Sequence, residues 1–341
     1  MKSYFRAAVV FWVLPLPVTG CSGPTPDERE GQSCTRTAPH LLEQEFRKYA
    51  PFQTYSLQTE GGVADLHLST TNLPVTKPDV SRWVASAAKA VATYYGRFPI
   101  PRVSILVVAE GEDRIESGKT FEGRWILIKL GRKTTTADLR SDWTMTHEMF
   151  HLAFPDLDRS HLWMEEGMAT YLEPLARARI GNLTPEEVWK GLVDGIPKGM
   201  SKRRDRGLDQ TETWGATYWG GALFWLMADL EIRELSGNHR SLDDAMRGIL
   251  DAGGTGSVHW NVEQVLETGD RAAGFHVLRD LYARMGNEIY RPNLEELWQR
   301  CGFHLDLEHR IIFDTGSPQS GLRRSMTAPT EPPPVKLSGT P

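Results

Sequence analysis

Cysteine is scarce in this 341-residue sequence, which contains only Cys21, Cys34 and Cys301. Three cysteines are too few for a disulfide scaffold, and they exclude a zinc site built from four cysteines. Cys34 and Cys301 could pair in an oxidising compartment, but the sequence does not show whether they lie close together. Any zinc site in this chain therefore has to draw on other side chains.

Concentrated positive charge is also missing. The 39 Lys and Arg residues stand against 44 Asp and Glu residues, which gives a net charge of −5, and there is no long basic run. Because binding to nucleic acid needs a concentrated positive surface, we predict no nucleic-acid partner. The 40% of hydrophobic and 24% of charged residues are typical of a folded protein and exclude collagen, a coiled coil and a wholly disordered chain.

Long apolar runs are absent except at the N-terminus, where Lys2 and Arg6 precede the run Ala7–Val18. This run is shorter than the roughly 20 residues that a bilayer-spanning helix needs, and two prolines interrupt it. A basic start followed by a short apolar run is typical of a signal peptide.

The end of this run, Val-Thr-Gly-Cys at 18–21, resembles the lipobox of bacterial lipoproteins, in which small residues precede a cysteine that becomes lipidated. The resemblance implies that residues 1–20 are a lipoprotein signal peptide and that acyl chains on Cys21 anchor the protein to a membrane. We expect a location in the cell envelope, on a periplasmic or extracytoplasmic face, and Ser22 is compatible with the outer membrane. The alternative is an ordinary secretory signal with an incidental cysteine.

Composition divides the remaining chain into three parts. Residues 21–40 are rich in Pro, Gly, Ser, Thr and charge, which predicts a flexible tether. Residues 328–341 include five prolines and few apolar side chains, which predicts a disordered tail. Residues 41–327 show neither a repeat nor a second linker, and we expect them to form one domain.

Strands precede helices within that domain. Alternating or continuous apolar runs predict strands at 53–58, 63–69, 103–108 and 125–130, and an amphipathic pattern predicts a helix at 80–95. From Thr136 onward the pattern is almost entirely helical, and this order favours an α+β fold. The segment Thr120–Leu130 is either an edge strand, to which an extended peptide adds by backbone pairing, or a purely structural strand.

A metal-binding pattern lies at His147-Glu148-Met149-Phe150-His151, which reads HExxH. On a helix, positions i and i+4 share one face, so both imidazoles point toward one site. Two neutral imidazole nitrogens suit a tetrahedral Zn²⁺ ion. Zinc lowers the pKa of a bound water, and Glu148 lies next to that site and can remove its proton. We therefore predict that His147 and His151 bind zinc and that Glu148 is the general base.

A catalytic zinc needs a third protein ligand and one open position. After a polar turn, a second helical segment begins at Leu162 and can present a carboxylate to the same site. The residues alone leave Glu165, Glu166 and Glu173 as candidates on this segment, and His161 as a candidate in the preceding loop.

The HExxH pattern followed by Trp-x-x-Glu-Gly-x-Ala-x-Tyr at 163–171 resembles the gluzincin zinc metallopeptidases, such as the membrane alanyl and glycyl aminopeptidases. There the glutamate before the glycine is the third zinc ligand, which implies this role for Glu166. The resemblance also implies a thermolysin-like catalytic domain at 41–327 and one zinc ion per chain. The alanyl aminopeptidase motif Gly-Ala-Met-Glu-Asn is absent from the sequence, so exopeptidase specificity is not implied.

A third stretch resembles the glycyl aminopeptidases. Tyr-x-x-Gly at 218–221 opens an apolar helix that ends in Asp-Leu-x-Ile-Arg at 229–233, and Ser-Leu-Asp-Asp-x-Met-Arg follows at 241–247. In related aminopeptidases this tyrosine stabilises an oxyanion, which implies that Tyr218 donates a hydrogen bond to charge that develops in the transition state. Without the resemblance, Tyr218 would be interpreted as a core or rim aromatic among neighbouring tryptophans.

Together these features predict a lipid-anchored zinc metallopeptidase that hydrolyses peptide bonds in a peptide or protein substrate. A second hypothesis is a catalytically idle zinc-containing lipoprotein that serves binding or assembly in the envelope. Glu148 argues against it, because a structural zinc site needs no base. A third is a zinc hydrolase that acts on another substrate class.

Overall fold

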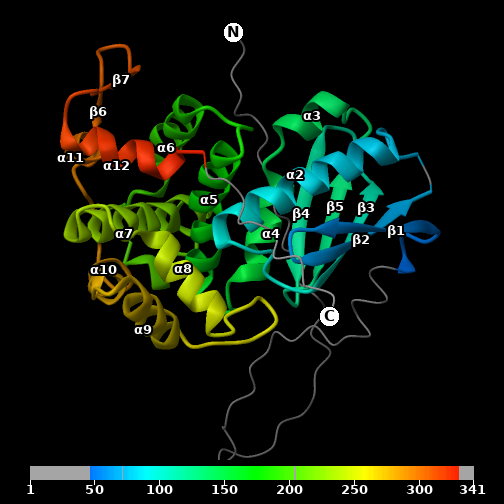
Figure 1. Ribbon diagram of the computed structural model, residues 1–341, viewed down its shortest axis with the longest axis horizontal. Coiled ribbons are helices and arrows are strands. Elements are labelled where there is room, and N and C mark those ends of the chain that lie inside the picture. Colours follow the sequence, from blue (N-terminus) through cyan, green and yellow to red (C-terminus); the bar gives the residue numbers. More distant parts are fainter. Residues whose placement is uncertain (1–46, 71, 203–204, 330–341) are drawn as a thin grey trace, which may run out of the picture. The chain divides into compact units, whose positions relative to one another are not determined.

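The computed structural model describes residues 47–70, 72–202 and 205–329 (Figure 1). The described residues from Phe52 onward pack as one unit. The predicted signal peptide and tether, with Cys21 and Cys34, lie outside the described residues, as does most of the predicted tail. Within the described ranges, no helix is both long enough and apolar enough to cross a membrane.

A five-stranded sheet in the order β1-β2-β3-β5-β4 forms the first part of this unit. The strands are β1 (Phe52–Thr59), β2 (Gly62–Ser69), β3 (Arg102–Ala109), β4 (Ile115–Phe121) and β5 (Trp125–Leu130). The β2–β3 and β3–β5 pairs are parallel, whereas β1–β2 and β4–β5 are antiparallel. Gly61, with a φ of 102°, makes the tight turn between β1 and β2 because glycine adopts positive φ without strain.

The edge of this sheet decides between the two alternatives for Thr120–Leu130. Strand β5, which makes up most of this segment, lies between β3 and β4, so the edge-strand alternative is wrong for it, and the two edge strands are β1 and β4. The sequence did not indicate β4 because Ile115–Phe121 contains Gly118 and charged side chains and shows no apolar alternation. Because the residues of β4 are only partly buried, its sequence carries no clear strand signal.

Helix α2 (Lys77–Tyr95) packs against β1, α4 and α5. It begins three residues before the predicted helix because Thr76 and Asp79 form a capping box and Pro78 occupies the first turn. It ends as predicted before Gly96, whose φ of 81° terminates the helix. Two short helices, α3 (Thr136–Ser141) and α4 (Thr144–Phe150), follow the sheet.

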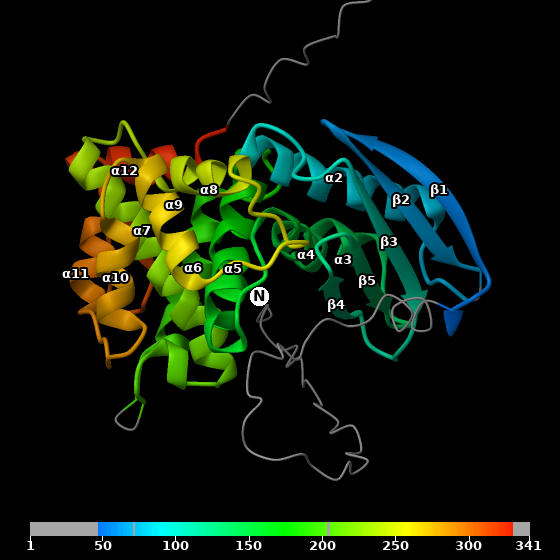
Figure 2. The ribbon, with the colours of Figure 1, turned by 90° about the horizontal axis from the view of Figure 1, so that it is seen from below.

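Helices make up almost all of the remaining unit. Their bounds are η1 (His151–Ala153), η2 (Arg159–His161), α5 (Leu162–Arg179), α6 (Pro185–Gly199), η3 (Leu208–Gln210), the π-helical turn η4 (Gly215–Gly220), α7 (Gly221–Ser236), α8 (Leu242–Asp251), α9 (Val262–Ala273), α10 (Val277–Met285), α11 (Leu294–Arg300) and α12 (Pro318–Thr327). A small hairpin of β6 (Phe303–Leu305) and β7 (Ile311–Phe313) interrupts them. Figures 1 and 2 show α4 between the sheet and these helices, and the predicted α+β order is confirmed.

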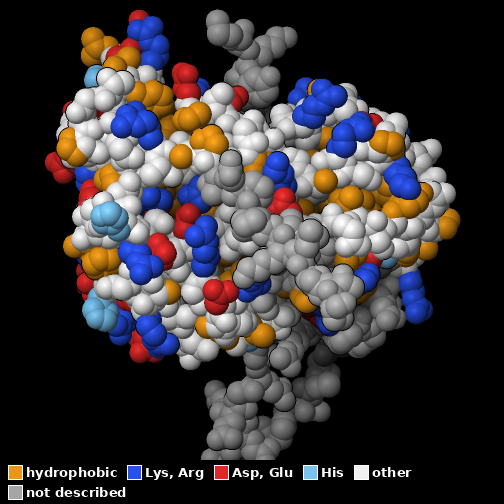
Figure 3. Space-filling view, in the orientation of Figure 1, with side chains coloured by type: hydrophobic (Ala, Val, Ile, Leu, Met, Phe, Trp, Pro, Cys, Tyr) orange, Lys and Arg blue, Asp and Glu red, His pale blue; other side chains and the backbone are white. Residues whose placement is uncertain are grey.

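Charged side chains of both signs share the surface. Figure 3 shows Lys and Arg interspersed with Asp and Glu on the face it draws. Exposed or half-exposed pairs include Arg284–Glu231 at 3.1 Å and Arg300–Glu234 at 2.7 Å. Such surface pairs contribute only about 0–1 kcal/mol each to stability. The pairs that matter most for the fold are therefore the buried ones.

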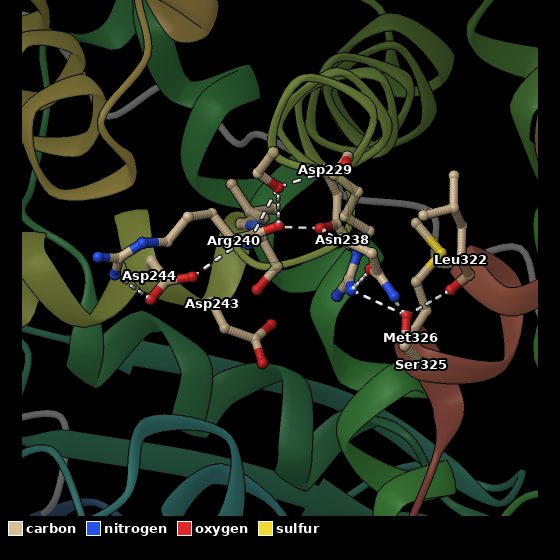
Figure 4. A network of polar contacts seen from close by, with 12 residues as sticks. Asp229, Asn238, Arg240, Asp243, Asp244, Leu322, Ser325 and Met326 are labelled. Atoms are coloured by element: carbon tan, nitrogen blue, oxygen red, sulfur yellow. Dashed lines mark hydrogen bonds and ion pairs between the residues drawn. The ribbon is translucent and has the colours of Figure 1, made fainter.

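A buried network joins α5, α7 and α8 at Asp229, whose side chain is 1% exposed (Figure 4). Its carboxylate accepts hydrogen bonds from the Tyr171 hydroxyl at 3.0 Å, the Arg233 Nε at 2.8 Å and the Leu242 N–H at 2.9 Å. Three donors around one carboxylate satisfy a charge that would otherwise be costly to bury.

The same network extends to α12. Arg179 donates to both oxygens of Asp243, at 2.6 and 3.1 Å, and to the Met326 carbonyl at 3.0 Å. Burial raises the pKa of Asp243, but the Arg179 guanidinium outweighs this effect and holds the pKa below its usual value. Asp229 and Asp243 both belong to the stretch that resembles the glycyl aminopeptidases, so this part of the pattern stabilises the helical half.

We predict that Asp229→Ala lowers the free energy of unfolding by about 3–5 kcal/mol, because it leaves the buried Arg233 guanidinium and two other donors without their acceptor. Urea denaturation followed by circular dichroism measures the change. Asp251→Ala is the matched control, because Asp251 pairs with Arg97 at the surface with side chains 69% and 46% exposed, and it should cost less than about 1 kcal/mol. Equal losses in both variants would contradict a structural role for Asp229.

Candidate metal centre

Helix α4 carries His147, and His151 follows directly at its C-terminal end as the first residue of η1. All seven residues of α4 are buried, and the helix packs against β4 and α5. Its first turn is held by Asp142, whose carboxylate accepts hydrogen bonds from the Met145 N–H and from the indole N–H of Trp83 on α2, each at 3.0 Å. One helical turn separates His147 from His151, and their ring centroids lie 5.1 Å apart. The spacing therefore brings both imidazoles to one site, as predicted.

Glu166 on α5 completes a group of three possible metal ligands. Its Oε2 lies 3.0 Å from the His147 Nε2 and 3.6 Å from the His151 Nε2, and one ligand atom of each residue lies within 4.8 Å of the others. A tetrahedral zinc site with bonds of about 2.0–2.1 Å places neighbouring ligand atoms about 3.3 Å apart. Two imidazoles and one carboxylate are also a usual catalytic zinc set, so the residues fit this metal.

The charges of His147, His151 and Glu166 are coupled to one another. Burial alone would lower the pKa of His151, but the Glu166 carboxylate outweighs it and raises the pKa to about 9. Burial alone would raise the pKa of Glu166, but His151 and His147 hold it well below its usual range. The three side chains by themselves therefore retain a proton between them, and a bound cation would supply that positive charge instead.

Close contact between α5 and the start of α7 positions Glu166. A Cβ atom added at Gly167 would lie 2.3 Å from the Cα of Gly221, so the two backbones touch with no side chain between them. The indole N–H of Trp225 on α7 also donates to the Met164 carbonyl at 2.9 Å. Small residues at this crossing therefore set the position of the carboxylate next to Gly167.

Glu148 occupies a separate place beside this group. Its side chain contacts β4, where the Thr120 hydroxyl lies 2.7 Å from Oε2 and 2.8 Å from the Glu148 carbonyl oxygen. A Cβ atom at Gly118 would lie 2.7 Å from the Glu148 Cγ, so glycine is needed there. Burial, the largest cause, raises the pKa of Glu148. Neither Thr120 nor Gly118 was predicted as a site residue, because the sequence of β4 carries no clear strand signal.

Tyr218 lies in the π-helical turn η4, a type of distortion that is frequent at functional sites. Its ring stacks on His147 with centroids 6.1 Å apart and on Trp214 with centroids 5.9 Å apart. Burial raises the pKa of the phenol, and so do the Glu166 and Glu148 carboxylates. Tyr218 therefore keeps its proton at neutral pH and can donate a hydrogen bond next to the three possible ligands.

The other candidates for a third ligand have different partners. The Glu165 carboxylate accepts a hydrogen bond from the Leu157 N–H at 3.1 Å, and burial raises its pKa to about 8. Glu173 pairs with Arg177 at 2.7 Å. The His161 Nε2 lies 3.0 Å from the Tyr282 hydroxyl. The structure thus brings together His147, His151 and Glu166 and places the other three candidates elsewhere.

No protein-family model matches the chain, and no curated protein matches it by sequence. Among solved structures, an aminopeptidase N family protein from Idiomarina loihiensis is similar with a TM-score of 0.58 and 15% identity, over 75% of this chain and 50% of that one. An M1 zinc metallopeptidase from Deinococcus radiodurans matches with a TM-score of 0.46 and 16% identity, over 72% and 53% of the two chains. Aminopeptidase A from Legionella pneumophila, solved with aspartic acid, matches with a TM-score of 0.48 and 13% identity, over 70% and 28%.

This chain therefore spans about half the length of the Idiomarina protein and less than a third of the Legionella protein. At 15% identity, the likeness to the Idiomarina protein is evidence for the fold alone. It confirms the predicted α+β fold, which this chain shares with that protein.

We predict that Glu166→Gln weakens zinc binding by at least about 100-fold, because an uncharged amide is a poor ligand beside two imidazoles. Glu165→Gln is the matched control, because it alters the adjacent residue and keeps an acceptor for the Leu157 N–H. Zinc content after dialysis, measured by mass spectrometry, should be near one ion per chain for wild type and Glu165→Gln. Loss of zinc from Glu165→Gln with retention in Glu166→Gln would reverse the assignment.

Proposed function

We propose that this chain is a zinc-dependent metallopeptidase with one zinc ion per chain, held by His147, His151 and Glu166. The observation that carries the proposal is the position of Glu148. Its carboxylate lies beside the three possible ligands, yet it is held by the neutral Thr120 hydroxyl rather than by an arginine or lysine. A purely structural zinc site does not need a second carboxylate held in this way.

Each residue then has a defined part in hydrolysis. Zinc bound at this site would supply Lewis-acid chemistry, lowering the pKa of a water and polarising a carbonyl. Glu148 accepts the proton of the attacking water and passes it to the leaving amine, and Thr120 keeps its carboxylate in place. Tyr218 donates a hydrogen bond to the carbonyl oxygen as negative charge develops on it.

Strand β4 supports a peptide as the substrate class. It is one of the two edge strands of the sheet, and β5 is its only strand partner among the described residues. Gly118 and Thr120 of this strand contact Glu148 directly. An extended peptide that pairs with β4 as an added strand therefore runs past the general base. Most other hydrolase substrates have no backbone that can pair in this way.

We predict that Glu148→Gln lowers kcat for peptide hydrolysis by at least about 1,000-fold while zinc stays bound, because the amide cannot accept the proton. Tyr218→Phe should lower kcat by about 100-fold with zinc retained, because it removes one hydrogen bond to the oxyanion. Cleavage of a diverse peptide library by zinc-loaded wild type and both variants, analysed by mass spectrometry, measures these effects.

Two outcomes would contradict the proposal. Zinc-loaded wild type that cleaves no peptide in the library would argue against a peptidase and leave a hydrolase of another substrate class. Equal rescue of a deletion phenotype by wild type and Glu148→Gln would favour the alternative of an idle zinc-containing lipoprotein for envelope binding or assembly.

We further propose that the chain is held at the cell envelope by acyl chains on Cys21, supported by the lipobox-like Val-Thr-Gly-Cys at 18–21. Expression of the full chain in a bacterial host with a fatty-acid analogue should label wild type and place it in the membrane fraction. Cys21→Ser should abolish the label and release the protein from that fraction. Label that persists in Cys21→Ser would refute the anchor.

A further inference from the structure

Four aromatic rings form a row across the proposed active site. Trp143 meets His147 edge-on with centroids 5.2 Å apart, His147 stacks on Tyr218, and Tyr218 stacks on Trp214. The two ends of the row are exposed, with Trp143 46% and Trp214 53% accessible. Leaving a large indole in contact with water is unfavourable. The exposure of both indoles, on either side of His147, therefore points to a bound molecule that covers them.

A pocket of about 180 Å³ lies beside Trp214. Its apolar wall is formed by Leu162, Trp163, Leu208 and Trp214 (the Trp214 pocket). An apolar cavity of about 150 Å³ is large enough to bind benzene. The Trp214 pocket therefore has room for one large apolar or aromatic side chain.

The charged side chains that line the Trp214 pocket are of opposite sign and lie close together. The indole N–H of Trp163 donates to Asp209 at 2.8 Å, which leaves the ring for apolar contact. Arg159 and Glu212, which also line the pocket, lie 3.5 Å from each other and offset each other's charge. The pocket thus presents no unpaired charge that would select a charged side chain.

The Trp214 pocket lies within reach of a peptide bound at the metal centre. Trp163 of its wall is one helical turn before Glu166 on α5, and Trp214 is one turn before Tyr218. Two ring contacts of about 6 Å separate Trp214 from His147. An extended peptide advances about 3.4 Å per residue, so a side chain within about three residues of the cleaved bond reaches the pocket.

We propose that the Trp214 pocket is a specificity pocket that binds one large apolar or aromatic side chain of the substrate, within about three residues of the cleaved bond. This inference rests on the proposed function, because it takes the substrate to be a peptide. Charged and small side chains are disfavoured at that position, since they would either bury an unpaired charge or leave the indole in contact with water.

The test starts from library cleavage by wild type, which identifies the preferred position, and continues with a peptide pair that carries Phe or Ala there. Wild type should favour the Phe peptide by about 30-fold or more in kcat/KM. Trp214→Ala should reduce this ratio to about 3-fold or less, mainly through KM and with zinc retained. Leu162→Ala, which shortens another residue of the apolar wall, should reduce it as well. Leu235→Ala is the matched control, because Leu235 is 63% exposed on α7 and does not line the pocket, and it should leave the ratio unchanged.

A binding measurement separates failure of the pocket from failure of the proposed function. Zinc-loaded Glu148→Gln is titrated with each labelled peptide, and fluorescence anisotropy gives Kd. In one outcome, wild type cleaves no peptide, whereas the Phe peptide binds at least 10-fold more tightly than the Ala peptide and this difference depends on Trp214. That outcome would support the pocket and contradict the peptidase proposal. If peptides are cleaved without an apolar preference, or with one that Trp214→Ala retains, the pocket is refuted while the peptidase proposal stands.

Discussion

The backbone contact between α5 and α7 is the constraint on which the proposed active site depends. A Cβ atom at Gly221 would lie 2.0 Å from the Trp163 carbonyl oxygen, and one at Gly167 would lie 2.3 Å from the Gly221 Cα. The residue before Gly167 is Glu166, and Tyr218 lies three residues before Gly221. One crossing of two helices therefore sets the positions of both the Glu166 carboxylate and the Tyr218 phenol. Any side chain at either glycine would move the two groups apart.

The two glutamates near the metal centre differ because their surroundings differ. Glu166 faces two imidazoles, which favour its charged form and lower its pKa. Glu148 is buried against β4, where the neutral Thr120 hydroxyl donates to its carboxylate, and burial outweighs the two nearby histidines and raises its pKa. A ligand has to be charged, whereas a general base has to accept a proton. These surroundings therefore suit Glu166 to the proposed role of zinc ligand and Glu148 to the proposed role of general base.

The sequence predicted the histidine pair well because a spacing of four residues on a helix carries its own geometry. It could not choose between Glu165 and Glu166 from the residues alone, since adjacent helical positions point about 100° apart and either can face the histidines. That choice depends on the rotation of α5, which the distant Gly221 sets. The role of Thr120 was invisible for the same reason, because β4 meets α4 only in the folded chain.

The start of α5 also connects the metal centre with the Trp214 pocket. Asp209 accepts hydrogen bonds from the Trp163 indole and the Tyr282 hydroxyl. Burial alone would raise the pKa of Asp209, but His161, Tyr282 and Trp163 outweigh it and hold the pKa below its usual value. Trp163 is thereby fixed between η3 and α10, and its ring stacks on Tyr282. Because Trp163 and Glu166 lie one turn apart on one rigid helix, the pocket wall and the carboxylate cannot shift independently. A side chain bound in the pocket is therefore held at a constant distance from the group that would bind zinc.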